Sequence, residues 1–119
     1  MPETDIRQRS FDLAVRIVRL CRHLDRQPGS IRTISHQLVR AGTSVGANVE
    51  EAQAGQSKAD FVCKMVIALK EARETCYWLR VIAASHILAT EKVSDLQNEA
   101  EQIKKILGSI VVATKKSVR

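Results

Sequence analysis

One stretch decides the fold: residues Ser57 to Ser85, which read SKADFVCKMVIALKEARETCYWLRVIAAS. Apolar residues recur in it at spacings of three and four, which is the repeat of one face of an α-helix. This first stripe consists of Phe61, Met65, Ala68, Leu69, Ala72, Cys76, Leu79 and Ala83. A second stripe on another side of the same helix mixes apolar groups with two carboxylates, and it consists of Ile67, Glu71, Glu74 and Trp78. A helix with two such sides serves two contacts, so we predict one contact inside the subunit and one with a second subunit.

Three further helices surround this one. The apolar repeat predicts helices over residues 5–24, 30–54 and 91–114 in addition to 58–85. The connections are short and contain most of the turn-forming residues, such as Pro28 and Gly29, with Ser30 and Ser57 as expected N-caps. Helices joined by short connections lie antiparallel to their neighbours. The sequence therefore predicts an all-α protein, an up-down-up-down antiparallel four-helix bundle in a single domain of residues 1–119.

The composition narrows the class of protein further. The N-terminus lacks an apolar signal segment and no apolar stretch is long enough to span a bilayer, so we expect a cytoplasmic protein.

Three cysteines, Cys21, Cys63 and Cys76, lie among apolar neighbours without a CxxC pair. Buried free thiols are therefore expected in preference to a disulfide or a metal site. The formal net charge of +6 favours acidic partners, of which nucleic acid is the obvious one.

The sequence shows no pattern of an enzyme. None of the three histidines, His23, His36 and His86, follows a glutamate at the Glu-x-x-His spacing of di-iron bundles. Three candidate nucleophiles, Ser44, Cys63 and Cys76, have no histidine at a spacing that a helix would bring alongside. No Walker loop or GxGxxG pattern occurs. We predict no enzymatic activity, no metal and no cofactor.

The candidate phosphate contacts are basic residues of the first and last helices. At 100° per residue, Arg9, Arg16, Arg19, Arg22 and Arg26 share the side of the first helix opposite its apolar stripe. This row is either a solvated outer face or a surface that contacts phosphates, for which arginine is well suited. The candidate nucleic-acid contacts are Arg9, Arg16, Arg19, Arg22, Lys104, Lys105, Lys115 and Lys116.

A polar row on the second helix faces the acidic stripe of the third. Ser44, Asn48 and Glu51 would meet Glu71 and Glu74 if these helices pack antiparallel. The group is either a structural network that fixes helix register or a site for a ligand or partner. Lys64, Arg40 or Arg73 could supply a counter-charge to Glu71.

Two further features of these helices bear on packing. Trp78 is either a core residue or an anchor for a neighbouring subunit. Gly42 and Gly46, in the middle of the second helix, indicate a close approach by another helix.

Three segments of the sequence together resemble a known family. They are SVGANVEEA at residues 44–52, SKxDF at residues 57–61, and ALKEARETxYWL at residues 68–79. The combination is similar to bacterial four-helix-bundle proteins encoded in intervening sequences of large-subunit ribosomal RNA genes. Many members have Ile-Ala-Glu-Gly where this chain has Val49-Glu50-Glu51-Ala52. The glycine of that motif is replaced here, so the second helix is expected to run on to Gly55.

The resemblance implies a fold and an assembly more clearly than a role. It implies an up-down bundle that forms a homopentameric ring, and it implies no enzymatic activity. Relatives include the accessory protein of diversity-generating retroelements, which binds a reverse transcriptase and nucleic acid through a basic surface. We therefore expect a non-enzymatic, ring-forming bundle that binds RNA, DNA or a ribonucleoprotein partner such as a reverse transcriptase. The alternative is a protein-interaction scaffold without a nucleic-acid partner.

Overall fold

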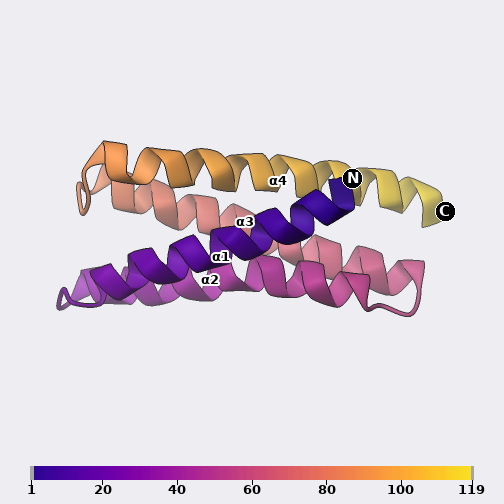
Figure 1. Ribbon diagram of the computed structural model, residues 1–119, viewed down its shortest axis with the longest axis horizontal. Coiled ribbons are helices and arrows are strands. Elements are labelled where there is room, and N and C mark those ends of the chain that lie inside the picture. The colour runs from indigo at the N-terminus through magenta and orange to yellow at the C-terminus, as the bar shows by residue number, and fades with distance from the viewer. Residues whose placement is uncertain (1, 119) are drawn as a thin grey trace.

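The computed structural model describes the backbone of residues 2–118 and the side chains of residues 6–117. It contains four helices: α1 (Pro2–Leu24), α2 (Ser30–Gln53), α3 (Lys58–Ala84) and α4 (Thr90–Val118). Successive helices run in opposite directions along a body of 48 × 21 × 20 Å (Figure 1). The predicted all-α, up-down-up-down antiparallel four-helix bundle is confirmed.

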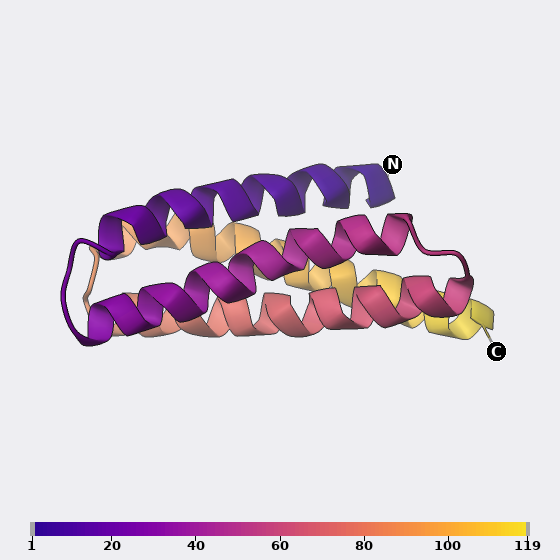
Figure 2. The ribbon, with the colours of Figure 1, turned by 90° about the horizontal axis from the view of Figure 1, so that it is seen from below.

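Each helix packs against its neighbours in the chain, and α1 and α4 close the bundle (Figure 2). The contact between α1 and α4 is the sparsest of the four. Three helix ends differ from the expected ones. The first helix begins at Pro2, three residues before the expected start, and the second stops at Gln53 and does not run on to Gly55. The fourth helix continues past residue 114 to Val118, since no glycine or proline follows Gly108 within it.

One core, consisting mainly of aliphatic residues and alanine, runs the length of the bundle. It contains the predicted stripe of α3 from Met65 to Leu79, with Phe61 and Ala83 only partly buried at its two ends. The other helices contribute the following fully buried large side chains: Ile6, Leu13, Ile17, Leu24, Leu38, Val45, Val49, Ile103 and Leu107. Because four helices share this core, the faces that remain outside it are what can carry function.

Two glycines let α1 lie close against α2, as their position in mid-helix predicts. A Cβ added at Gly42 would lie 2.4 Å from Ile17 Cδ1 and 3.0 Å from Ile17 Cγ2. A Cβ added at Gly46 would lie 3.1 Å from the backbone oxygen of Ser10. Because glycine has no side chain, α1 can lie this close to α2 at both positions.

The turns follow the expected residues with one exception. Ser57 caps α3 by accepting a hydrogen bond from the Asp60 backbone N–H at 3.1 Å. Ser30, in contrast, is the first residue of α2 and not its N-cap; Gly29 precedes the helix with φ of 76°, which glycine adopts without strain. His86 occupies the left-handed region (φ 56°) directly after α3, a conformation that is unusual for a residue other than glycine.

The expectation of three buried thiols is wrong for Cys63, which is exposed. It lies on the side of α3 that faces away from the core, where apolar neighbours along the chain do not bury it. Cys21 and Cys76 are buried. Burial raises the pKa of the Cys21 thiol, and it raises the pKa of Cys76 to about 12, so both stay protonated at neutral pH.

Candidate nucleic-acid and subunit interfaces

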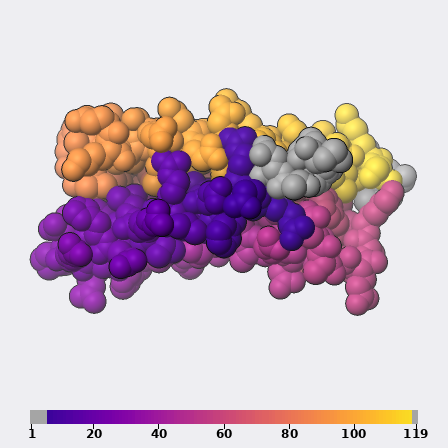
Figure 3. Space-filling view, viewed as in Figure 1, coloured from indigo at the N-terminus to yellow at the C-terminus, as the bar shows by residue number. Residues whose placement is uncertain are grey.

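Two of the predicted phosphate contacts lie at the seam between α1 and α4. Arg9 donates to both carboxylate oxygens of Glu99, from Nε at 3.0 Å and from Nη2 at 2.7 Å. Arg16 donates from Nη2 to Asp95 at 3.1 Å. The side chains of α1 reach α4 along the face seen in Figure 3. These arginines therefore close the bundle, and their charges are balanced by carboxylates 79 and 90 residues away in the chain.

The other predicted cations fall into two groups. Lys104 lies 2.8 Å from Glu101, one helical turn away; this pairing raises the pKa of Lys104, and Lys104 in turn is the main cause that lowers the pKa of Glu101. Arg19 and Arg22, near the end of α1, are exposed, as are Lys105, Lys115 and Lys116 on α4. Among the described side chains, these five make no hydrogen bond or ion pair.

Arg40 of α2 is the centre of a polar cluster with α3. It donates to Glu71 at 3.2 Å and to Glu74, whose carboxylate also accepts a hydrogen bond from Trp78 Nε1 at 3.0 Å. The Trp78 N–H and then the Arg40 guanidinium lower the pKa of Glu74, while the hydrogen bond to Glu74 is the largest of the effects that raise the pKa of Arg40. We call Arg40, Glu71, Glu74 and Trp78 the Arg40 cluster.

The Arg40 cluster differs from the network predicted from the sequence. Ser44 donates to the carbonyl of Arg40 at 2.6 Å, and Asn48 donates to the carbonyl of Ser44 at 2.8 Å, so both side chains bond within their own helix. Glu51 is exposed and lies near the turn after α2, beside Cys63 and Lys64. The expectation that Ser44, Asn48 and Glu51 meet the carboxylates of α3 is therefore not met in the structure.

The side chains of the second stripe of α3 differ in how deeply they are buried. Glu71 is buried and Trp78 is partly buried against the core, whereas Ile67 keeps 37% of its surface exposed. Tyr77 is exposed by 53% and meets the Trp78 ring edge-on, with ring centroids 5.1 Å apart. Ile67 is thus an exposed apolar group about three turns of α3 away from the Tyr77–Trp78 ring pair; these three side chains are here called the α3 surface.

Comparisons with known proteins agree on one family. The family model for 23S rRNA-intervening sequence proteins matches residues 2–109. The chain belongs to this family. It is also similar to the crystal structure of a protein of unknown function from the S23 ribosomal protein family of Bacteroides thetaiotaomicron VPI-5482. The two share 39% identity with a TM-score of 0.86, over 93% of this chain and 98% of that one. No curated protein matches the chain.

Membership in the 23S rRNA-intervening sequence protein family confirms the resemblance carried by residues 44–79. Neither the family description nor the structural relative names an enzyme. In the described part of the chain, no group of three His, Cys, Asp or Glu side chains is arranged to hold a metal ion. Over the same residues, no helix has the length and apolarity needed to cross a membrane.

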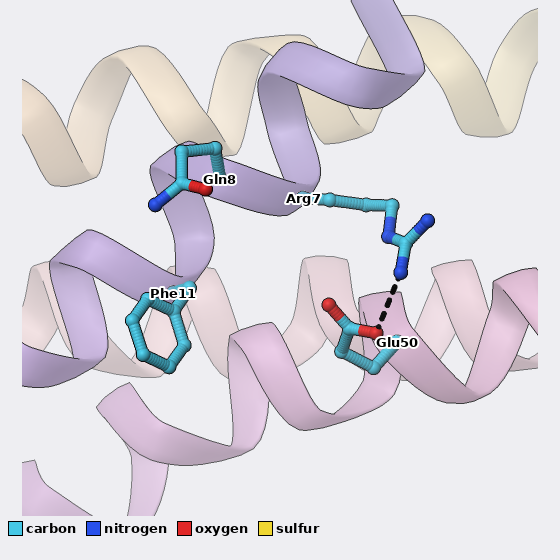
Figure 4. A pocket seen from close by; sticks show the side chains of 4 residues that line it. All are labelled: Arg7, Gln8, Phe11 and Glu50. Carbon is cyan, nitrogen blue, oxygen red and sulfur yellow. Dashed lines mark hydrogen bonds and ion pairs between the residues drawn. The ribbon is translucent and has the colours of Figure 1, made fainter.

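A hollow of about 390 Å³ lies beside Phe11. Arg7 of α1 reaches Glu50 of α2 at 3.0 Å, with Gln8 and the 58% exposed ring of Phe11 lining the same space (Figure 4). Its one ion pair is exposed on both sides. Among the described residues that line it, the hollow has neither a nucleophile nor an acid-base pair, and we assign it no chemistry.

Sequence reasoning missed the partners of the arginines in this intervening sequence protein. Glu99 and Asp95 lie on α4, and their contact with α1 depends on the register of two helices that are far apart in the chain. Arg40 was one of three possible counter-charges to Glu71, and the structure selects it. The sequence pointed to Arg40 in one way: it precedes Ser44 by four residues, so both lie on the polar side of the second helix.

Proposed function

We propose that this protein is a non-enzymatic, oligomeric bundle that binds RNA through the exposed arginines at the C-terminal end of α1. One observation carries the proposal: Arg19 and Arg22 are exposed and have no carboxylate partner among the described side chains. Arg9 and Arg16, in contrast, are balanced by α4. Nucleic-acid affinity comes mainly from phosphate contacts by such unbalanced cations.

Further cations lie at the same end of the bundle. Arg26 follows α1, and Arg32 lies in the first turn of α2, and both are exposed. Along the chain, the carboxylate nearest to Arg22 and Arg26 is that of Asp25, whose Oδ1 lies 3.9 Å from Nε2 of His36. With a formal net charge of +6 for the whole chain, this arginine-rich end favours a polyanion.

The test is a titration of fluorescent RNA at several salt concentrations. Between about 50 and 200 mM salt, the affinity of the wild type should fall steeply. Arg19→Ala/Arg22→Ala should weaken binding and reduce the slope of log K against log salt by about two, since each phosphate contact contributes about one. The matched control is Lys58→Ala/Lys64→Ala, which removes the same charge from the start of α3.

Two results would contradict the proposal. Equal losses in both double variants would mean that net charge alone drives binding. Absence of RNA binding at physiological salt would favour the second candidate, a protein-interaction scaffold. That candidate is supported by the carboxylate partners of Arg9, Arg16 and Lys104, which neutralise three of the eight predicted contacts.

We also propose that copies of the chain associate through the α3 surface, and the family resemblance implies a ring of five. What supports this is that α3, which lines the core, also leaves large apolar side chains exposed on its outer side. Ile67 and Tyr77 are exposed by 37% and 53%. Large apolar groups gathered on one face are typical of protein interfaces.

A further inference from the structure

The C-terminal half of α4 carries a hollow and an adjoining open surface, both away from the proposed RNA-binding arginines of α1. The hollow, of about 450 Å³, lies between α3 and α4 and is lined by Val66, Leu69, Lys70, Arg73, Gly108, Val111, Val112 and Lys115. The open surface lies over the outer side of α4 and consists of Lys105, Gly108, Ser109, Val112, Ala113 and Lys116. They share Gly108 and Val112, so we treat them as one feature, the α3/α4 groove.

No contact among the described residues explains why position 108 is a glycine. A Cβ added there would meet no heavy atom within 4 Å, whereas one at Gly42 or Gly46 would collide with α1. Glycine weakens a helix interior, and a side chain could be added here at no steric cost to the bundle. A glycine of this kind is explained when the backbone of another molecule lies directly against the helix.

The groove combines an apolar floor with a basic rim. Val112 is 56% exposed and Val66 is 37% exposed, and Leu69 and Val111 extend the floor toward the core. The rim consists of Lys70, Arg73, Lys105, Lys115 and Lys116. None of the described residues that line the α3/α4 groove is acidic.

We infer that the α3/α4 groove binds an acidic amphipathic α-helix of another protein. The apolar face of such a helix would cover Val66 and Val112, Gly108 would admit its backbone, and its carboxylates would pair with the rim. Residues 105–116 span about 16 Å of α4, so the matching helix needs about three turns. Apolar anchors flanked by complementary charge are the usual mode of recognition of a helix in a groove.

Two other occupants fit less well. Single-stranded RNA binds in a positively charged groove and stacks its bases on aromatic rings; the rim of this groove supplies the charge, but its floor is aliphatic and no ring for stacking is among its described lining residues. A second copy of this chain would have to offer a helix with unpaired carboxylates. Its most acidic helical segment is residues 91–101, where Asp95, Glu99 and Glu101 are already paired with Arg16, Arg9 and Lys104.

The experiment selects peptides from a displayed library of random sequences of about 16 residues, long enough for roughly 24 Å of helix. The full chain is the bait, and affinities of the selected peptides are then measured by fluorescence anisotropy. Selected peptides should have apolar residues at helical spacing and several Asp or Glu on the flanking positions. Gly108→Leu should weaken them at least about tenfold, and Gly108→Ala by less.

A stability measurement accompanies the binding assay and separates a docking role from a structural one. Gly108→Ala should unfold at a higher urea concentration than the wild type while binding the peptide more weakly. Arg19→Ala/Arg22→Ala serves as the control with an intact groove and should bind the peptide as the wild type does. Loss of RNA binding and loss of peptide binding are thereby distinguished.

Four outcomes would overturn the inference. The selection could yield no acidic helical peptide. Alternatively, the selected peptides could bind the Gly108→Leu variant as tightly as they bind the wild type. The Gly108→Leu variant without peptide could have a smaller particle mass than the wild type, which would show that a second copy occupies the groove. RNA affinity could fall in Gly108→Leu as much as peptide affinity, which would assign the groove to nucleic acid.

Discussion

Arg40 shows how a single cation organises the surface between α2 and α3. Its two carboxylate partners, Glu71 and Glu74, lie one turn apart on α3, so the guanidinium bridges both from the opposite helix. Glu74 in turn accepts the indole N–H of Trp78, which positions that ring at the edge of the core. No buried side-chain nitrogen or oxygen lacks a hydrogen-bond partner among the described residues. The Arg40 cluster thus satisfies a buried carboxylate and also positions the α3 surface.

Glu74 should make the stability of the protein depend on pH. The Trp78 N–H and Arg40 hold its pKa below the ordinary value of 4.5, so the unfolded chain takes up a proton at a higher pH than the folded one. Its contribution is therefore present above about pH 4.5 and is lost as the pH falls through the lower, folded-state pKa. Glu74→Gln should reduce the free energy of unfolding at neutral pH by up to about 1 kcal/mol.

Urea unfolding followed by circular dichroism between about pH 7 and pH 3 measures this effect. The difference in stability between wild type and Glu74→Gln should shrink as the pH falls. Glu51→Gln is the control, since Glu51 is exposed and has no hydrogen bond or ion pair to a described side chain. A difference that stays constant over the whole range would mean that Glu74 is not stabilised by its charge.

At the scale of the helix, identical substitutions should have opposite effects at two glycines. A Cβ at Gly46 would lie 3.1 Å from the Ser10 oxygen and 3.3 Å from the Ser10 carbonyl carbon, which are backbone atoms and cannot rotate away. Gly46→Ala should therefore destabilise the bundle by roughly 1 kcal/mol, because overpacking of about 1–3 kcal/mol exceeds the gain in helix propensity. Gly108→Ala should stabilise it by up to about 1 kcal/mol.

Urea unfolding of the two alanine variants tests this comparison, and each serves as the control for the other. Both variants replace a glycine inside a helix by alanine, so helix propensity should change the free energy of unfolding equally in the two. Any difference between them then comes from the atoms around each position. Equal changes in the unfolding midpoint would show that α1 does not restrict Gly46. A loss of stability in Gly108→Ala would remove the basis for reading that glycine as a contact point for a partner.

The apolar repeat was sufficient to predict the helices and the core, because burial in a bundle follows the helical period. It could not place side chains whose surroundings depend on a second helix. Arg9 projects away from the apolar stripe of α1, yet it meets Glu99 because α4 lies on that flank. Ser44 and Asn48 bond to carbonyls of their own helix, an alternative that spacing does not reveal. Cys63 was misassigned because α3 is apolar on two sides.

At the scale of the whole molecule, the proposed RNA-binding arginines and the α3/α4 groove lie toward opposite ends. The α1 helix ends beside the start of α2, whereas α4 ends at the far end of the 48 Å bundle, as Figure 1 shows. Arg19 and Arg22 belong to the first end, and Lys115 and Lys116 to the second. One subunit could therefore hold RNA and a protein helix at the same time, and a ring would repeat both surfaces around its axis.

Assembly through the α3 surface is best tested with a matched pair of charge substitutions. Ile67 and Val18 are both exposed by 37%, but Ile67 lies on the α3 surface and Val18 on α1. A carboxylate at either position should cost the folded subunit little, since each side chain already meets solvent. Buried between subunits, however, an unpaired charge is costly. Ile67→Glu should therefore reduce the native particle mass, while Val18→Glu should not.

Sedimentation or native mass measurement at several protein concentrations gives the result directly. Trp78→Ala should also weaken assembly more than folding, although it is a less clean variant because it removes the hydrogen bond to Glu74 and a contact with the core. Circular dichroism of Ile67→Glu separates dissociation from unfolding. A wild type that is monomeric, or an Ile67→Glu particle of unchanged mass, would show that the apolar side of α3 is not where copies meet. The Arg40 cluster would then serve only to hold α2 against α3 within one subunit.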